Sequence, residues 1–107
     1  MVGQTLALLH ADPGHPWTLA ELARRVASSR SKLGERFTNL VGQPPMQYLT
    51  QWRMQVAATL LVQSSAKVAS IGTAVGYDSE AAFSRAFKKS TGFAPGAWRE
   101  VRRSTPA

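Results

Sequence analysis

Residues 79–99 read SEAAFSRAFKKSTGFAPGAWR, and residues 29–49 read SRSKLGERFTNLVGQPPMQYL. The two stretches carry apolar residues and helix breakers at the same positions, 50 residues apart. The matched positions are Leu33, Phe37, Gly42, Pro45 and Tyr48 in one stretch and Phe83, Phe87, Gly92, Pro95 and Trp98 in the other. Agreement over so many positions indicates an internal repeat.

The repeat extends upstream with a shift of one residue. Leu19, Leu22 and Val26 correspond to Val68, Ile71 and Val75 at a spacing of 49. A one-residue difference in spacing that is confined to the turn between two helices is expected for a duplicated helix-turn-helix. Each copy is too short to bury its own apolar face, so we expect two units that share a core.

Length and composition limit the class of protein. A chain of 107 residues with 44% hydrophobic residues fits one compact domain, or two small lobes that lean on a connecting helix. The absence of cysteine excludes disulfides, thiolate metal sites and cysteine nucleophiles. No apolar run approaches the roughly 18 residues of a membrane span, and the beginning of the chain lacks the basic start of an export signal. We therefore predict a cytoplasmic protein without a membrane segment.

The charge balance points to a polyanionic partner. Thirteen Lys and Arg against six Asp and Glu give a net charge of +7 and a pI near 10.9. Nucleic acid is the first candidate and an anionic membrane surface the second.

The periodicity of apolar residues predicts an all-α fold of about seven helices. Helices are expected over 2–10, 19–26, 30–41, 45–63, 68–75 and 80–90, followed by one last turn from Pro95 to Trp98 and a frayed tail after Arg103. This divides the chain into a first helix-turn-helix subdomain (1–43), a long linker helix (44–64) and a second helix-turn-helix subdomain (65–107).

Local signals set the ends of these helices. Thr18 with Glu21 three residues later forms a capping box, and Ser79 caps the sixth helix. Gly42 and Gly92 end the third and sixth helices, and Gly76 opens a turn by tolerating positive φ. In the third helix, the side chains expected on the inner face are Leu33, Phe37, Leu40 and Val41. Phe37, Phe87, Trp52 and Trp98 are expected in the core rather than as stacking platforms for bases.

The second helix of a helix-turn-helix lies in the DNA major groove, so it needs an apolar inner face and an outer face with hydrogen-bond donors and small residues. Both candidate helices have this pattern. For the second, the outer face consists of Glu80, Ala81, Ser84, Arg85, Lys88 and Lys89. Such a face on an isolated helix would more often be a solvated surface. The repeat and the positive charge favour DNA.

The linker helix supplies a geometric argument. About 20 helical residues span roughly 30 Å, and two helices that read successive major-groove segments on one side of B-DNA must lie roughly 34 Å apart. A single chain could then bind DNA as a dimer of ordinary helix-turn-helix units does.

These residues resemble the DNA-binding domain of the AraC/XylS family of bacterial transcription regulators. The run from Ala82 to Lys89, followed by Gly92, Pro95 and Trp98-Arg99, is similar to the family signature. So is the segment 45–61, with Tyr48-Leu49, Arg53-Met54, Ala57 and Leu60-Leu61. The similarity covers roughly residues 18–103 and implies a two-lobed all-helical transcription factor that binds double-stranded DNA.

Carried over by position, the resemblance implies two sets of contact residues. Base contacts would fall at Ser31, Gly34, Glu35, Glu80, Ala81, Ser84 and Arg85. Backbone contacts would fall at Thr18, Arg30, Lys32, Arg36, Lys88 and Lys89. The base contacts of the first helix depart from the family, in which a small polar residue and an Arg often stand at the positions of Gly34 and Glu35. Arg85, able to bind guanine O6 and N7 together, is the best single candidate for reading a base.

Several other residues have more than one interpretation. Arg53 could contact phosphate or point inward and pair with a carboxylate or carbonyl across the lobes. The side chains of Arg99, Arg102 and Arg103 could contact phosphate or only keep the end of the chain soluble. His10 and His15, with Asp12 between them, lie around a breaker loop that gives them no fixed spacing, so no metal site is predicted.

The sequence offers no basis for an enzyme or a cofactor, since it has no paired carboxylates at useful spacing and no Gly-rich phosphate loop after a strand. The alternative function is a protein-interaction module that contacts RNA polymerase or a regulator partner and has only non-specific DNA affinity. Family members commonly carry an N-terminal effector or dimerisation domain. The short stretch before Thr18 leaves no room for one, so we expect either an excised domain or a stand-alone regulator.

Overall fold

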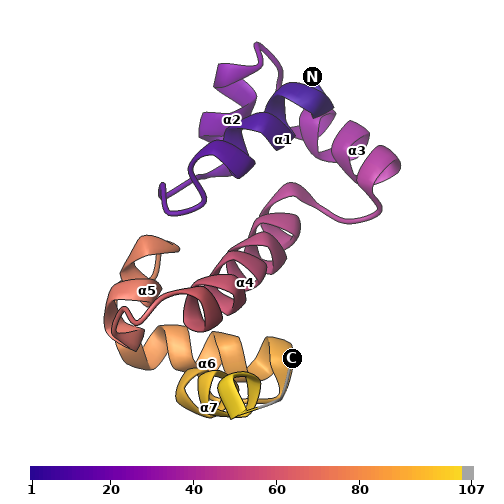
Figure 1. The fold of residues 1–107 in the computed structure, drawn as a ribbon. Helices are drawn as coiled ribbons and strands as arrows, with labels where there is room; N and C mark the ends of the chain where they lie inside the picture. The colour runs from indigo at the N-terminus through magenta and orange to yellow at the C-terminus, as the bar shows by residue number, and fades with distance from the viewer. Residues whose placement is uncertain (105–107) are drawn as a thin grey trace. The chain divides into compact units, whose positions relative to one another are not determined.

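The computed structural model describes residues 1–104 and contains seven helices in that range (Figure 1). They are α1 (Val2–Ala11), α2 (Leu19–Arg25), α3 (Arg30–Val41), α4 (Pro45–Gln63), α5 (Val68–Ala74), α6 (Glu80–Thr91) and α7 (Pro95–Ser104). None of these residues lies in a strand, so the predicted all-α fold is confirmed. The tail predicted to fray after Arg103 falls largely on residues 105–107, which are outside the described residues.

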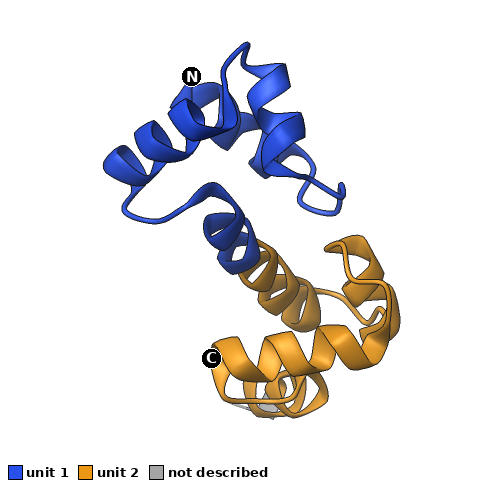
Figure 2. Cartoon of the chain, turned by 180° about the vertical axis from the view of Figure 1, so that it is seen from behind, with its two compact units in different colours: residues 1–52 blue, residues 53–107 orange. Residues whose placement is uncertain are grey.

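The chain forms two compact units, residues 1–52 and residues 53–107 (Figure 2). The division falls inside α4, whose first residues belong to one unit and whose later residues belong to the other. The predicted subdomain boundaries after residues 43 and 64 stay a prediction.

Each unit has its own buried core, so the expected single shared core is wrong. The core of the first unit contains Leu9, Trp17, Leu22, Ala23, Leu33 and Leu49. The core of the second contains Met54, Ala57, Leu61, Ile71, Val75, Phe83 and Phe87. Residues of α4 complete both clusters, because a pair of short helices cannot enclose its apolar side chains alone.

The turn between the two helices of each helix-turn-helix has the same hydrogen bonding. The Ser28 N–H donates to the Ala23 carbonyl at 2.8 Å, and at the equivalent place in the second unit the Tyr77 N–H donates to the Gly72 carbonyl at 2.9 Å. Thus the predicted repeat is also a repeat of backbone structure.

The turns differ in one residue that takes positive φ. Gly76 has a φ of +98°, as predicted, whereas its counterpart Ala27 has a φ of +54°. Non-glycine residues occasionally occupy the left-handed region, which is centred at a φ of about +57°. The Ala27 angle lies in that region and the Gly76 angle lies outside it. A Cβ at Gly76 would also lie 3.0 Å from the guanidinium carbon of Arg53. Glycine is therefore required at only one of the two turns.

The ends of α3 and α6 are specified in the same way. The side chains of Ser29 and Ser79 each accept a hydrogen bond from the backbone N–H three residues further on. At the other end, Gly42 and Gly92 adopt φ values of 94° and 85°. Serine caps and left-handed glycines are strong helix boundaries, and the predicted ends of both helices are correct to within a residue.

Two predictions about packing need correction. Leu40, predicted on the inner face of α3, is 76% exposed, whereas Val41 beside it is partly buried, so the covered side of the last turn is narrower than the apolar pattern. Phe37 and Phe87 are fully buried as expected, and Trp98, although partly exposed, packs against the core of the second unit, whereas Trp52 is only partly buried. Trp17 is buried although no periodic pattern includes it. It precedes the cap Thr18 and shares a core with Leu22, the positions of a hydrophobic staple.

The last helix is also longer than the single turn predicted. Its arginines hold the end of α4: the Arg99 side chain donates to the carbonyls of Leu61 at 2.8 Å and Ala66 at 2.6 Å, and Arg103 donates to that of Ser64 at 2.6 Å. The last carbonyls of a helix have no partner within the helix. These contacts connect α7 to the end of α4 and to the loop after it, and they give two of its arginines a structural role.

Candidate nucleic-acid interface

The α6 helix separates apolar from polar side chains. Phe83 and Phe87 are fully buried in the second unit. On the rest of the helix Glu80, Ala81, Arg85, Lys88 and Lys89 are exposed and Ser84 is half-buried. The structure therefore brings the residues predicted for contact in this unit together on one accessible side of α6.

The α3 helix has the same arrangement in the first unit. Leu33 and Phe37 are fully buried. Ser31, Glu35, Arg30, Lys32 and Arg36 are exposed, and Gly34 is half-buried. All the predicted contact residues of this helix are thus exposed except Gly34, which is half-buried.

The two helices carry equal charge but distribute it differently. On α3 three basic residues (Arg30, Lys32 and Arg36) outweigh one acid, Glu35. On α6 three basic residues (Arg85, Lys88 and Lys89) outweigh Glu80. The acid lies in the middle of α3 but at the start of α6, where a helix N-terminus stabilises it. Hence the middle of α6 is positive and the middle of α3 is mixed.

Thr18, predicted to contact the DNA backbone, caps α2. Its hydroxyl oxygen accepts a hydrogen bond from the Glu21 N–H at 3.0 Å. The predicted reciprocal half of the capping box is replaced by other contacts, since the Glu21 carboxylate accepts from His15 at 2.9 Å and from Arg25 at 3.0 Å. The hydrogen bond from His15 is the main reason that the pKa of Glu21 is lowered. Thr18 keeps its hydroxyl hydrogen for a further acceptor.

Arg53 lies half-buried against the turn that precedes α6. A Cβ at Gly76 would lie 3.0 Å from its Nη2 atom, so the guanidinium packs directly on the turn backbone. Burial lowers the pKa of Arg53 and raises the pKa of the neighbouring Tyr77. This contact lies within the second unit, so phosphate contact and pairing across the lobes both stay predictions for Arg53.

The two histidines make separate contacts. His10 shares a hydrogen bond of 2.6 Å with the Tyr48 hydroxyl, and its ring lies 4.6 Å from that of Trp52. His15 binds Glu21 and packs on the Trp17 ring at 4.2 Å. Each histidine thus connects a helix or loop to an aromatic side chain of the first unit.

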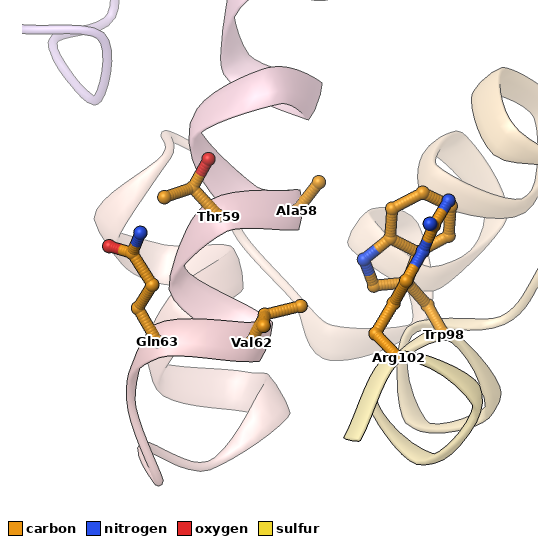
Figure 3. Close-up of a pocket in the computed structure, with 6 residues that line it drawn as sticks. All are labelled: Ala58, Thr59, Val62, Gln63, Trp98 and Arg102. Carbon is orange, nitrogen blue, oxygen red and sulfur yellow. The ribbon is translucent and has the colours of Figure 1, made fainter. Parts of the chain in front are cut away.

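A shallow groove of about 410 Å³ lies between α4 and α7 in the second unit (Figure 3). Its lining residues are Ala58, Thr59, Val62, Gln63, Trp98 and Arg102. Ala58 and Val62 point toward Trp98, and the Arg102 guanidinium lies 4.2 Å from the centre of the Trp98 ring. This cation–π contact accounts for the third arginine whose role the sequence left open.

The described part of the chain contains no helix with the length and apolar character of a membrane span.

Comparison with known proteins defines the family. The pattern of the helix-turn-helix domain family matches residues 22–101. A putative AraC-like transcription regulator of Streptomyces antibioticus is 49% identical over 100 residues, which cover 94% of this chain and 33% of that protein. The chain is an AraC-type helix-turn-helix domain. Members of this family are transcription regulators rather than enzymes.

Other similar proteins agree with this assignment. The RCS-specific HTH-type transcriptional activator RclR of Escherichia coli K12 is 38% identical over 106 residues, 98% of this chain and 37% of RclR. The DNA-binding domain of AdpA, a global transcriptional factor solved in complex with a target DNA, superposes with a TM-score of 0.91 at 27% identity. That match covers 96% of this chain and 93% of the AdpA domain. This AraC-type domain spans about a third of the length of the curated relatives that it matches.

Proposed function

We propose that this AraC-type domain binds double-stranded DNA sequence-specifically and regulates transcription, with α3 and α6 entering successive segments of the major groove. The observation that carries the proposal is the exposure of Arg85 on α6, opposite the buried Phe83 and Phe87. The buried rings fix the helix to its unit, and the opposite side offers a guanidinium that can bind both acceptors of guanine.

The proposed contacts divide by chemistry. Base contacts are assigned to Ser31, Gly34 and Glu35 on α3 and to Glu80, Ala81, Ser84 and Arg85 on α6. Phosphate contacts are assigned to Thr18, Arg30, Lys32, Arg36, Lys88 and Lys89, because cationic side chains and hydroxyls bind phosphate oxygens without reading sequence.

Selection of bound sequences from a random duplex library tests this function. The expected result is one enriched motif, bound with an affinity that falls steeply with salt, at a log–log slope of about −5 for roughly six phosphate contacts. A protein-interaction module with non-specific DNA affinity would enrich no motif. Affinity that stays flat between low and high salt would contradict duplex binding itself.

A second experiment tests whether both units engage DNA. The α4 helix has 19 residues, which span about 28 Å at about 1.5 Å per residue. Inserting about 5 base pairs between the two halves of the selected motif turns one half to the far side of the duplex. We expect the insertion to weaken binding and to remove one of two footprints, whereas unchanged affinity would show that one unit binds alone.

The cellular location and the protein partners of the domain are also proposals. We propose that it acts in the cytoplasm with RNA polymerase as a protein partner, either as a stand-alone regulator or as part of a longer one with an N-terminal effector or dimerisation domain. In vitro transcription from a promoter that carries the selected motif tests this. Addition of the full regulator should change transcript yield, and a yield independent of the regulator would contradict the regulatory role.

A further inference from the structure

Gly34 is a glycine in the interior of α3 that the fold does not require. Its φ lies outside the positive range, and a Cβ built on it would meet no heavy atom within 4 Å. Alanine would therefore fit the backbone and the space around it. Alanine in place of glycine in a helix interior shifts the folding equilibrium toward the folded state by about five-fold. The chain therefore forgoes stability at this position.

Four other glycines of the domain have a reason within the fold. Gly42, Gly76 and Gly92 adopt positive φ. Gly72 lies against Phe83, whose Cβ would be 3.0 Å from an added Cβ. Gly34 shares its open surroundings with Gly3 and Gly96, which lie near the starts of α1 and α7.

The place of Gly34 in the middle of its helix distinguishes it from Gly3 and Gly96, each of which is the second residue of its helix. Ser31, three residues earlier, shares its side of α3, and Glu35 follows it directly. The corresponding position in α6 is Ser84, a residue with a side chain. The missing side chain thus falls beside the exposed Ser31 and Glu35, among the proposed base-reading residues of the first unit.

We propose that Gly34 determines specificity through its missing side chain: it lets the α3 backbone approach a base edge more closely than any other residue would allow. Glycine serves where a backbone must lie close to a ligand. The inference rests on the proposed DNA binding and adds a mechanism to it. In the first unit part of the selectivity then comes from backbone proximity rather than from a long side chain.

The test compares Gly34→Ala with the matched control Gly3→Ala. Gly34→Ala should raise the Tm by several degrees, about 4–8 °C, because it places alanine in a helix interior, and Gly3→Ala, in the first turn of α1, should raise it by less. Only Gly34→Ala should weaken binding to the selected motif, by about ten-fold or more, as a misplaced contact to one base pair does. Its affinity for unrelated duplexes should equal that of the wild type.

Library selection repeated with Gly34→Ala adds a second measurement. The expected result is a changed preference at one or two base pairs in the half bound by α3 and the same preference elsewhere. If Gly34→Ala kept the selectivity and affinity of the wild type, the proposed role of Gly34 would be overturned and the proposed DNA binding would stand. A wild-type domain that selects no motif would overturn the proposed function and this inference with it.

Discussion

Phe87 and Trp98 meet edge to face in the second unit, with ring centroids 5.7 Å apart and planes at 82°. The first unit contains the same pair at the matched positions of the repeat, where Phe37 and Tyr48 lie 5.7 Å apart at 70°. In each unit the pair joins the second helix of the helix-turn-helix to the helix that follows it. The repeat found in the sequence is therefore also a repeat of packing.

Phe37→Ala and Phe87→Ala should each lower the free energy of unfolding by about 3–5 kcal/mol, the usual result of truncating a fully buried ring. Chemical denaturation followed by circular dichroism measures this. Leu40→Ala is the control, because its side chain is 76% exposed and its loss should change stability by less than about 0.5 kcal/mol. Full stability of either Phe variant together with lost DNA affinity would contradict the core assignment.

Gly76→Ala should destabilise the domain by about 1–3 kcal/mol, since it forces an unfavourable φ and pushes a Cβ against Arg53. The converse change, Ala27→Gly, should alter the free energy of unfolding by less than about 1 kcal/mol, because relief of strain is offset by the greater freedom of unfolded glycine. Thermal denaturation of both variants compares the two turns. Equal effects would show that the turns have the same requirement.

Arg99→Ala should cost about 1.5–3 kcal/mol of stability, because it removes a cation that donates to the carbonyls of Leu61 and Ala66. Arg102→Ala is the matched control on the same helix, and loss of its contact with Trp98 should cost about 0.5–1 kcal/mol. If Arg99 contacted phosphate instead, its removal would reduce the salt slope of DNA binding and leave denaturation unchanged.

We predict that ionised Glu21 stabilises the fold and that this contribution is lost at acid pH. A hydrogen bond from His15 lowers the pKa of Glu21 in the folded state. Because a carboxyl of lowered pKa stabilises the fold when ionised, its contribution is present above its ordinary pKa of about 4.3 and is lost as the pH falls below that value. Tm measured from pH 7 to pH 3 should fall less steeply for Glu21→Gln than for the wild type. Parallel curves would contradict the role of this carboxylate.

The fold was predictable from the sequence because its boundaries depend on local signals. Serine caps, left-handed glycines and the period of the apolar residues fix α3 and α6 whatever surrounds them. Leu40 shows the limit of periodicity, which assigns a face to a residue but not a neighbour to cover it. Trp17 carried a usable signal, since an apolar residue directly before a helix cap is the first half of a hydrophobic staple.

The arginines were not predictable in the same way. Arg99 and Arg103 bind carbonyls that lie far from them in sequence, and Arg53 packs on a turn that only the folded second unit places beside it. A basic residue in a basic chain gives no local sign of whether it faces carbonyls, an aromatic ring or phosphate. The accessible side of α3 and of α6 was predictable, because it is the side left by the buried rings, and the DNA contacts proposed on it stay predictions.

The affinities of Arg85→Ala and Lys88→Ala for a panel of single-base variants of the selected motif, at one salt concentration, test the central claim most directly. Arg85 and Lys88 are both exposed on α6 and carry the same charge. Arg85→Ala should lose about 1–3 kcal/mol on the selected motif and lose discrimination at one guanine-containing base pair. Lys88→Ala should weaken every duplex in the panel alike. Uniform weakening by Arg85→Ala would contradict sequence reading by α6 and reduce Arg85 to a phosphate contact.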